Sequence, residues 1–348
     1  MKISIGTNIK DGPWGGGNLF AINLKNFLEK EGHTVCTDLK DNDIDIILIT
    51  EPRLTSESSA FTDTEVLKYL KYKNYQSIVV HRINECDERK NTDYVNKALI
   101  KANKTADYTV FVSNWLKELF LSQGIENESI KVILGGADSK IFNLDAKSNY
   151  KNEEKFKIVT HHWGNNWNKG FDIYSKLDQM LGLKEWSSRF EFTYIGNLPQ
   201  DFEFKNTKYI KPISGLELAN ELKKNHIYIT ASLNEPSGNH HIEAAQCGLP
   251  ILYIDSGGTP EYCNKFGVVF NNMNFEQKLI EISDQYSYYS EIISNYPFNS
   301  NKMCAEYLDL FEYLVKDKKT FIDKRNLPTI EVKDMVLLFF KAIYKKIR

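Results

Sequence analysis

The stretch Glu235-Pro-Ser-Gly-Asn-His-His-Ile-Glu243 decides how this chain is organised. Two short runs rich in β-branched and aromatic residues, Ile227–Thr230 before it and Ile251–Ile254 after it, are typical of buried strands. Residues 237–239 favour the start of a helix, and residues 248–250 favour its end. This order of strand, helix and strand predicts part of a parallel α/β sheet.

The loop at the start of that helix is a candidate anion site. Its backbone N–H groups and the positive end of the helix dipole favour a phosphate, and Gly238, between Ser237 and Asn239, allows a close approach. Glu235 and Glu243 add acceptors for sugar hydroxyls. The combination indicates a sugar nucleotide, whereas a plainer interpretation is that the two acids only complement the helix dipole.

The same region resembles the signature of a known enzyme family. Two glutamates with seven residues between them are followed by Ala-x-Cys-Gly-Leu-Pro at 245–250 and by Gly-Gly-Thr-Pro-Glu at 257–261. This pattern resembles family-4 retaining glycosyltransferases of the GT-B fold, in which the first glutamate contacts the donor sugar and the second the nucleotide ribose. The resemblance implies those roles for Glu235 and Glu243, with His240 among the donor-binding residues.

Length and composition bound the class of protein. The chain has 348 residues, of which 42% are hydrophobic and 26% charged, and a formal net charge of −2. That length suits two domains, and the charge gives no basic field for nucleic acid. The scattered cysteines, the immediate entry into a strand and the lack of any apolar run of about 18 residues lead us to expect a cytoplasmic protein without signal peptide or membrane span.

Short apolar runs alternate with helical patterns in both halves, which predicts two doubly wound α/β domains. A polar segment at 143–155 separates the halves. We predict an N-terminal Rossmann-like domain at 1–150 on the acceptor side, a C-terminal Rossmann-like domain at 151–317 on the donor side, and an extension at 318–348. Two such domains facing across a cleft form the GT-B architecture. The predicted strands are 2–7, 44–50, 77–83, 108–113, 131–134, 157–161, 191–195, 227–230, 251–254 and 268–270.

Lys169 is the candidate residue for binding the phosphates of the donor. It lies in the segment Thr160-His-His-Trp-Gly-Asn-Asn-Trp-Asn-Lys-Gly170, after the first strand of the second half. In the resembled family an Arg a few residues before Lys-Gly helps to bind the diphosphate. No Arg is present here, and His161, His162 or Trp163 occupies its region.

Two further candidates lie in the first half. Gly16 and Gly17 open a helix after the first strand, and Phe20 breaks a dinucleotide fingerprint. The resemblance implies that this loop faces the donor or the acceptor, and both glycines are donor-binding candidates. His81 stands near the carboxyl end of a strand, where ligands bind, and the family often has a His near the reacting sugar. The plainer interpretation of His81 is a structural histidine.

Metal chemistry is not expected. Asp41-Asn-Asp43 matches the Asp-x-Asp motif of another glycosyltransferase fold, but acids beside a strand are commonly solvated ends. The adjacent His pairs point apart on a strand or helix, which disfavours a shared metal. We predict no metal and no cofactor.

The sequence therefore predicts a retaining, metal-independent glycosyltransferase that moves a sugar from a nucleotide sugar to a glycan or lipid-linked acceptor in cell-surface polysaccharide or glycoconjugate synthesis. Lys169 and the N–H groups at 237–239 would stabilise the leaving diphosphate. Two alternatives remain, a GT-B sugar-nucleotide epimerase and a non-catalytic subunit that binds sugar nucleotides.

The last segment, 330–348, combines an apolar stripe at helical spacing with a basic end. From Glu331 onward it has five basic and two acidic residues, a net charge of +3. This pattern is typical of a helix lying on an anionic membrane. An equal alternative is a helix that packs on protein.

Overall fold

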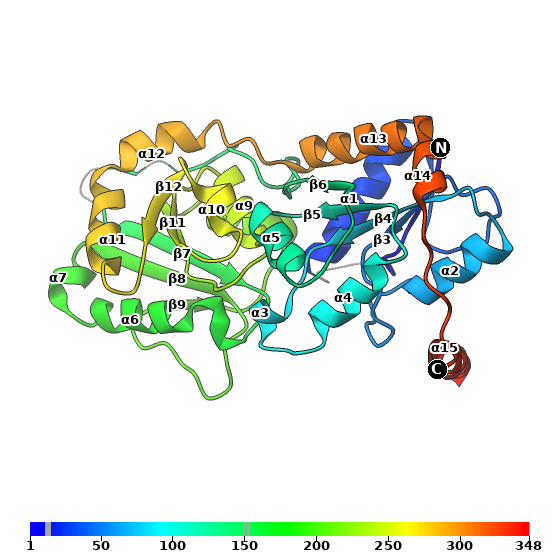
Figure 1. The fold of residues 1–348 in the computed structure, drawn as a ribbon. Coiled ribbons are helices and arrows are strands. Elements are labelled where there is room, and N and C mark those ends of the chain that lie inside the picture. Colours follow the sequence, from blue (N-terminus) through cyan, green and yellow to red (C-terminus); the bar gives the residue numbers. More distant parts are fainter. Residues whose placement is uncertain (11–14, 149, 152–153, 348) are drawn as a thin grey trace. The chain divides into compact units, whose positions relative to one another are not determined.

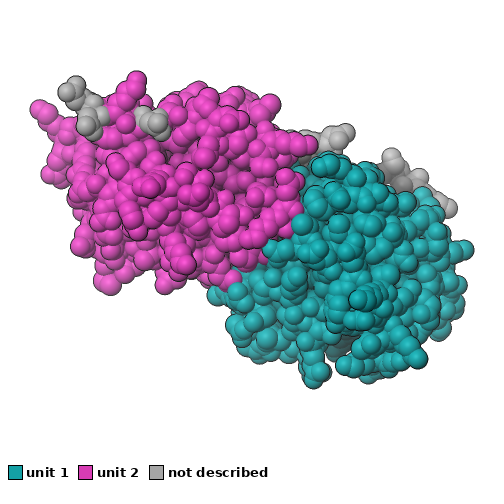
Figure 2. Space-filling model, turned by 90° about the horizontal axis from the view of Figure 1, so that it is seen from above, with its two compact units in different colours: residues 1–87, 92–133, 304–348 teal, residues 88–91, 134–303 magenta. Residues whose placement is uncertain are grey.

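The computed structural model describes residues 1–10, 15–148, 150–151 and 154–347, with the backbone alone for residue 337 and for residues 341–347. The chain forms two compact units, coloured in Figure 2. Unit 1 comprises Met1–Asp87, Thr92–Ile133 and Cys304–Arg348, and unit 2 comprises Glu88–Asn91 and Leu134–Met303. Each unit is built on one six-stranded sheet (Figure 1).

The sheet of unit 1 has the strand order β2-β1-β3-β4-β5-β6, and all neighbours are parallel. Every residue of β3 and β4 is buried, as expected when helices cover both faces of a sheet. Its strands are β1 (Lys2–Ile5), β2 (Thr34–Cys36), β3 (Ile46–Ile49), β4 (Ile78–Ile83), β5 (Tyr108–Phe111) and β6 (Ile130–Val132). The helices of the first half are α1 (Gly16–Lys30), α2 (Asp63–Tyr72), α3 (Asp87–Lys90), α4 (Val95–Asn103) and α5 (Asn114–Ser122).

The sheet of unit 2 has the order β12-β11-β10-β7-β8-β9 and is also parallel. The strand order reverses between β7 and β10, the place where open α/β sheets bind ligands beyond their carboxyl ends. Its strands are β7 (Phe156–His162), β8 (Phe190–Gly196), β9 (Lys208–Ile210), β10 (Ile227–Thr230), β11 (Ile251–Ile254) and β12 (Gly267–Phe270). Its helices are η1 (Trp167–Lys169), α6 (Phe171–Leu181), α7 (Lys184–Ser187), α8 (Gly215–Leu222), α9 (Asn239–Gln246), α10 (Thr259–Cys263), α11 (Phe275–Asp284) and α12 (Tyr286–Ile293).

Successive residues of the central strands of unit 2 face two different cores. Ile158 lies in a cluster with side chains of α6 and α11, whereas its neighbour Val159 lies in a second cluster with side chains of α8 and α9. Because strand side chains alternate, this places helices on both faces of the sheet. The predicted doubly wound α/β class is thereby confirmed.

The compact units do not follow the predicted domain boundaries. Residues 134–150 belong to unit 2, where Ala137 O accepts a hydrogen bond from the Ser300 N–H at 2.8 Å and the backbone at Asn299 leaves no room for a side chain at Gly136. The chain then returns to unit 1 through α13 (Ser300–Lys316), whose Tyr307 packs edge-on against Phe20 with ring centroids 5.2 Å apart.

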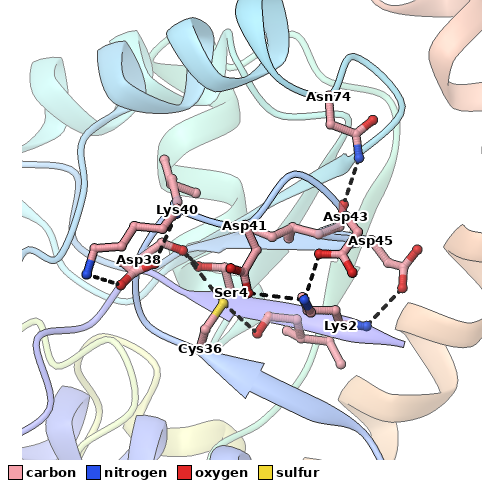
Figure 3. A network of polar contacts seen from close by, with 12 residues as sticks. Lys2, Ser4, Cys36, Asp38, Lys40, Asp41, Asp43, Asp45 and Asn74 are labelled. Carbon is pink, nitrogen blue, oxygen red and sulfur yellow. Dashed lines mark hydrogen bonds and ion pairs between the residues drawn. The ribbon is translucent and has the colours of Figure 1, made fainter.

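The acids of the Asp-x-Asp motif bind a lysine. Lys2 Nζ lies 3.1 Å from Asp41 Oδ2 and 2.6 Å from Asp43 Oδ1, and the Lys2 N–H donates to Asp45 Oδ2 at 2.8 Å (Figure 3). Hydrogen bonds from the Lys2 ammonium to Asp43 and Asp41 raise the pKa of Lys2. These carboxylates join the start of β1 to the segment before β3.

The C-terminal segment is fixed to unit 1 by a buried ion pair. After α14 (Lys318–Lys324), Arg325 donates from Nε and Nη2 to the Asp107 carboxylate at 2.7 and 2.6 Å, and it also contacts the carbonyl oxygens of Tyr75 and Ser77. Both ion-paired side chains are 2% exposed. The chain ends in α15 (Val332–Ile347), and within the described ranges no helix has the length and apolar content needed to cross a membrane.

Replacing Arg325 by Ala should destabilise unit 1 strongly, because it leaves the Asp107 carboxylate buried without its cation. We expect a loss of about 3–5 kcal/mol in the free energy of unfolding, measured by denaturant titration followed by circular dichroism. The control is Lys40→Ala, whose exposed pair with Asp38 should contribute less than about 1 kcal/mol. Equal effects of the two substitutions would contradict this role for Arg325.

Candidate functional site

Two loops converge at the carboxyl ends of β7 and β10, where the strand order of unit 2 reverses. The Leu233 N–H donates to Asn168 O at 2.8 Å, which joins the loop after β10 to η1. Gly170 has φ 99°, and a Cβ there would lie 2.5 Å from Ala231 Cβ, so only glycine permits this approach. The loops thereby bring Lys169 and Glu235 together.

Glu235 lies between two cations. Lys169 Nζ contacts Oε1, and Arg89 Nε lies 3.1 Å from Oε2. The side chains of Glu235 and Lys169 are 4% and 7% exposed, and that of Arg89 is 28% exposed. Burial by itself would raise the pKa of Glu235, but Arg89 and Lys169 outweigh it and lower that pKa to about 2. The carboxylate is therefore ionised at neutral pH.

Arg89 reaches this place from a distant part of the sequence. Its segment, Glu88–Asn91, belongs to unit 2. Asn234 Nδ2 donates to Glu88 O at 3.2 Å, and Asn168 Nδ2 donates to Arg89 O at 3.4 Å. Nothing in the sequence near Lys169 indicates this arginine, and it is not among the site residues that the sequence predicts.

Glu243, in α9, is held by the end of β7. Its Oε2 lies 2.9 Å from His161 Nε2, and both side chains are about nine-tenths buried or more. His161 therefore interacts with Glu243. The two glutamates of the motif sit in one region of unit 2, each with a different partner.

The amino end of α9 begins at Gly238, which has φ 70° and forms the N-cap without a side-chain hydrogen bond. A Cβ at Gly238 would lie 2.5 Å from His241 Cε1, so a side chain here would displace the histidine. Ser237 and Asn239 flank this glycine, as the sequence predicts. Gly238 has no side chain with which to cap the first backbone N–H groups of α9, and N–H groups at a helix start are suited to an anion.

Three imidazoles around these charges are neutral. Burial is the main cause that lowers the pKa of His162 and of His240 well below its usual value and lowers that of His241 to about 3. His162 Nε2 lies 2.7 Å from Tyr174 OH, and His240 Nε2 lies 2.9 Å from Thr230 Oγ1. His162 thus pairs with Tyr174, whose hydroxyl also accepts a hydrogen bond from the Ala231 N–H at 3.1 Å.

The remaining candidates lie in unit 1. His81 is fully buried in β4, with Nδ1 3.2 Å from Asn103 Nδ2, and burial lowers its pKa to about 3. Gly16 and Gly17 begin α1, and Asn18 exchanges two hydrogen bonds with the Lys10 backbone at 2.8 and 2.9 Å. The structure thus gathers Glu235, Lys169, His240, Glu243 and residues 237–239 in unit 2, and places His81, Gly16 and Gly17 in unit 1.

Comparison with known proteins finds one family model that matches part of the chain. The family model described as glycosyl transferases group 1 matches residues 198–296, which include both glutamates of the motif. No curated protein sequence matches the chain.

Several solved structures share the fold. A glycosyltransferase from Rickettsia africae ESF-5 is 16% identical, with a TM-score of 0.64 over 91% of this chain and 98% of that one. Anabaena Alr3699/HepE in complex with UDP is 13% identical, with a TM-score of 0.66 over 90% and 100% of the two chains. The catalytic domain of Starch Synthase IV from Arabidopsis thaliana, bound to ADP and acarbose, is 11% identical, with a TM-score of 0.69 over 90% and 99%.

These identities are low enough that the structural likeness speaks for the fold alone. The sequence match at 198–296 is independent of it and covers the loop that carries Glu235 and the helix that carries Glu243. Together the family match and the shared architecture indicate that this chain is a glycosyltransferase with the GT-B fold, similar to the group 1 glycosyl transferases.

Proposed function

We propose that the protein is a retaining, metal-independent glycosyltransferase of the family-4 type, which transfers a sugar from a nucleotide sugar to a glycan or lipid-linked acceptor of a cell-surface polysaccharide or glycoconjugate. The observation that carries the proposal is the Lys169–Glu235 pair at the point of strand reversal, beside the uncapped amino end of α9. A cation and the N–H groups at a helix start suit the diphosphate, and a carboxylate suits sugar hydroxyls.

In this proposal the donor separates a pair that is closed in the free protein. The diphosphate takes Lys169 and the N–H groups at 237–239, His240 supplies a neutral hydrogen-bonding group beside them, and Glu235 turns to the sugar hydroxyls. Glu243, oriented by His161, binds the ribose. A buried charge without a partner costs free energy. The site therefore favours a ligand that gives both Lys169 and Glu235 a new partner.

The reaction breaks the bond between the anomeric carbon and the diphosphate oxygen. The acceptor hydroxyl oxygen bonds to that carbon from the same side, and its proton passes to the departing diphosphate oxygen, so that configuration is retained. Negative charge grows on the diphosphate as the bond breaks, and Lys169 stabilises this charge most in the transition state. The scheme requires no metal, no cofactor and no separate base from the protein.

Gly16, Gly17 and His81 are proposed to act from unit 1. The glycines open α1 and present backbone to the donor. His81 is the candidate contact of the reacting sugar. Its complete burial and lowered pKa favour the alternative, a structural histidine.

The test is a panel of UDP, GDP, ADP and CDP sugars incubated with the protein, with and without EDTA. We expect one donor to release its nucleoside diphosphate slowly, at a rate that EDTA does not change. Early NMR spectra should show the anomeric configuration of the donor in the product. Loss of activity in EDTA or an inverted product would contradict the mechanism. Conversion of the donor into a second nucleotide sugar would indicate an epimerase, and binding without turnover a regulatory subunit.

The two glutamates should separate kinetically. Glu235→Gln should mainly lower turnover and Glu243→Gln should mainly weaken nucleotide binding, each on the order of 10–1000-fold, because each removes one preorganised interaction. Steady-state kinetics measure the turnover, and calorimetric titration with the nucleoside diphosphate measures the binding. Glu191→Gln, on an exposed position of β8, is the matched control and should change neither quantity. Full activity in both site variants would remove the assignment.

We also propose that α15 binds an anionic membrane surface. The helix belongs to unit 1 and is fastened by Lys101, whose Nζ lies 2.7 Å from Asp334 Oδ2. Val332, Phe339 and Phe340 are 80%, 63% and 61% exposed, an unusual cost for apolar side chains in water. The basic excess predicted beyond residue 340 lies outside the described side chains, and its charge complements anionic lipid.

Co-sedimentation of the full chain with phosphatidylserine-containing vesicles tests this proposal. Phe339→Glu with Phe340→Glu should reduce the bound fraction several-fold, because each Phe loses its favourable burial among the lipids. The control pair, Leu216→Glu with Met273→Glu, changes side chains that are 63% and 93% exposed on unit 2 and should leave sedimentation unchanged. Equal sedimentation of wild type and both pairs, or none at all, would show that α15 packs on protein.

A further inference from the structure

Glu235 contacts two cations, Lys169 and Arg89. The sequence motif predicts Lys169 at this site but does not predict Arg89. Lys169 follows β7 within unit 2, whereas Arg89 stands about eighty positions earlier in the chain. They contact the two oxygens of one carboxylate. Since those oxygens belong to one group, the two positive side chains lie next to each other. Any anion that draws Lys169 away from Glu235 therefore comes within reach of Arg89.

The loops that carry Lys169 and Glu235 also hold Arg89 in place. Asn168, immediately before Lys169, and Asn234, immediately before Glu235, donate their side-chain amides to the backbone oxygens of Arg89 and Glu88. Asn234 adopts φ 55°, a left-handed conformation that is costly outside glycine and is tolerated best by Asn and Asp. Backbone strain of this kind concentrates at functional sites.

A guanidinium suits a diphosphate better than the other groups present. It stays protonated at every relevant pH and presents a planar set of donors that matches phosphate oxygens. His162 and His240 are kept neutral by burial and bring no charge. Arg89 is 28% exposed, the most accessible of the three charged side chains, so it can turn from Glu235 to a ligand.

We propose that Arg89 is the second cation for the donor's diphosphate, paired with Lys169, and that Glu235 holds both cations in the free enzyme. This inference rests on the proposed donor site. Arg89, from the first half of the sequence, would bind the phosphates. This role does not depend on which base or sugar the donor carries. When the donor binds, its diphosphate replaces the Glu235 carboxylate between Lys169 and Arg89.

The experiment is calorimetric titration of wild type, Arg89→Gln and Arg89→Lys with the tightest binder among UDP, GDP, ADP and CDP, and with its nucleoside. Loss of one charge-assisted contact should weaken diphosphate binding about 10–100-fold in Arg89→Gln and less in Arg89→Lys. Nucleoside binding should stay within about twofold. Arg189→Gln is the matched control, since Arg189 also pairs with a carboxylate, Asp284, at the opposite end of β8.

A second comparison tests whether Arg89 binds the phosphate itself or only neutralises the charge of Glu235. If Arg89 binds phosphate, Arg89→Gln should also weaken diphosphate binding in a Glu235→Gln background. If its effect vanishes there, or if Arg89→Gln binds the diphosphate as wild type does, the proposal is overturned. Failure of every nucleoside diphosphate to bind wild type would instead refute the donor site itself, and this inference with it.

Discussion

The buried contact of Lys169 with Glu235 is the interaction on which the rest of the site depends. Neither charge could remain ionised alone in so dry a place, because removing one partner of a buried pair leaves the other uncompensated. The contact requires the loops after β7 and β10 to meet. That meeting depends on the strand order of unit 2 and on Gly170, and also on Gly257, whose missing side chain leaves room for the Glu235 backbone.

The electrostatics of the site are fixed by groups that do not titrate near neutral pH. Burial keeps His162, His240 and His241 uncharged, while Arg89 and Lys169 hold the pKa of Glu235 at about 2. A neutral histidine near these charges donates or accepts hydrogen bonds without adding repulsion. The two cations are therefore already charged when a diphosphate arrives.

Much of the fold follows from sequence pattern, because buried parallel strands read as short apolar runs. β2 and β9 were missed: each has three residues, lies at a sheet edge and is partly exposed, so it lacks that pattern. The nearness of Lys169 and Glu235 follows from the order of β7 and β10. Arg89 carries no local signal, since its place depends on how a distant segment joins unit 2. His81 has the position of a crevice residue, but its ring is fully buried and contacts Asn103.

A crystal structure of the protein with its nucleotide-sugar donor tests the central claim most directly. We expect the diphosphate to lie between Lys169 Nζ, Arg89 and the first N–H groups of α9, and Glu235 to have released Lys169 and to face the sugar hydroxyls. A donor bound elsewhere on the molecule would contradict the proposed donor site. A diphosphate bound while Lys169 and Glu235 stay in contact with each other and apart from it would contradict the exchange of partners.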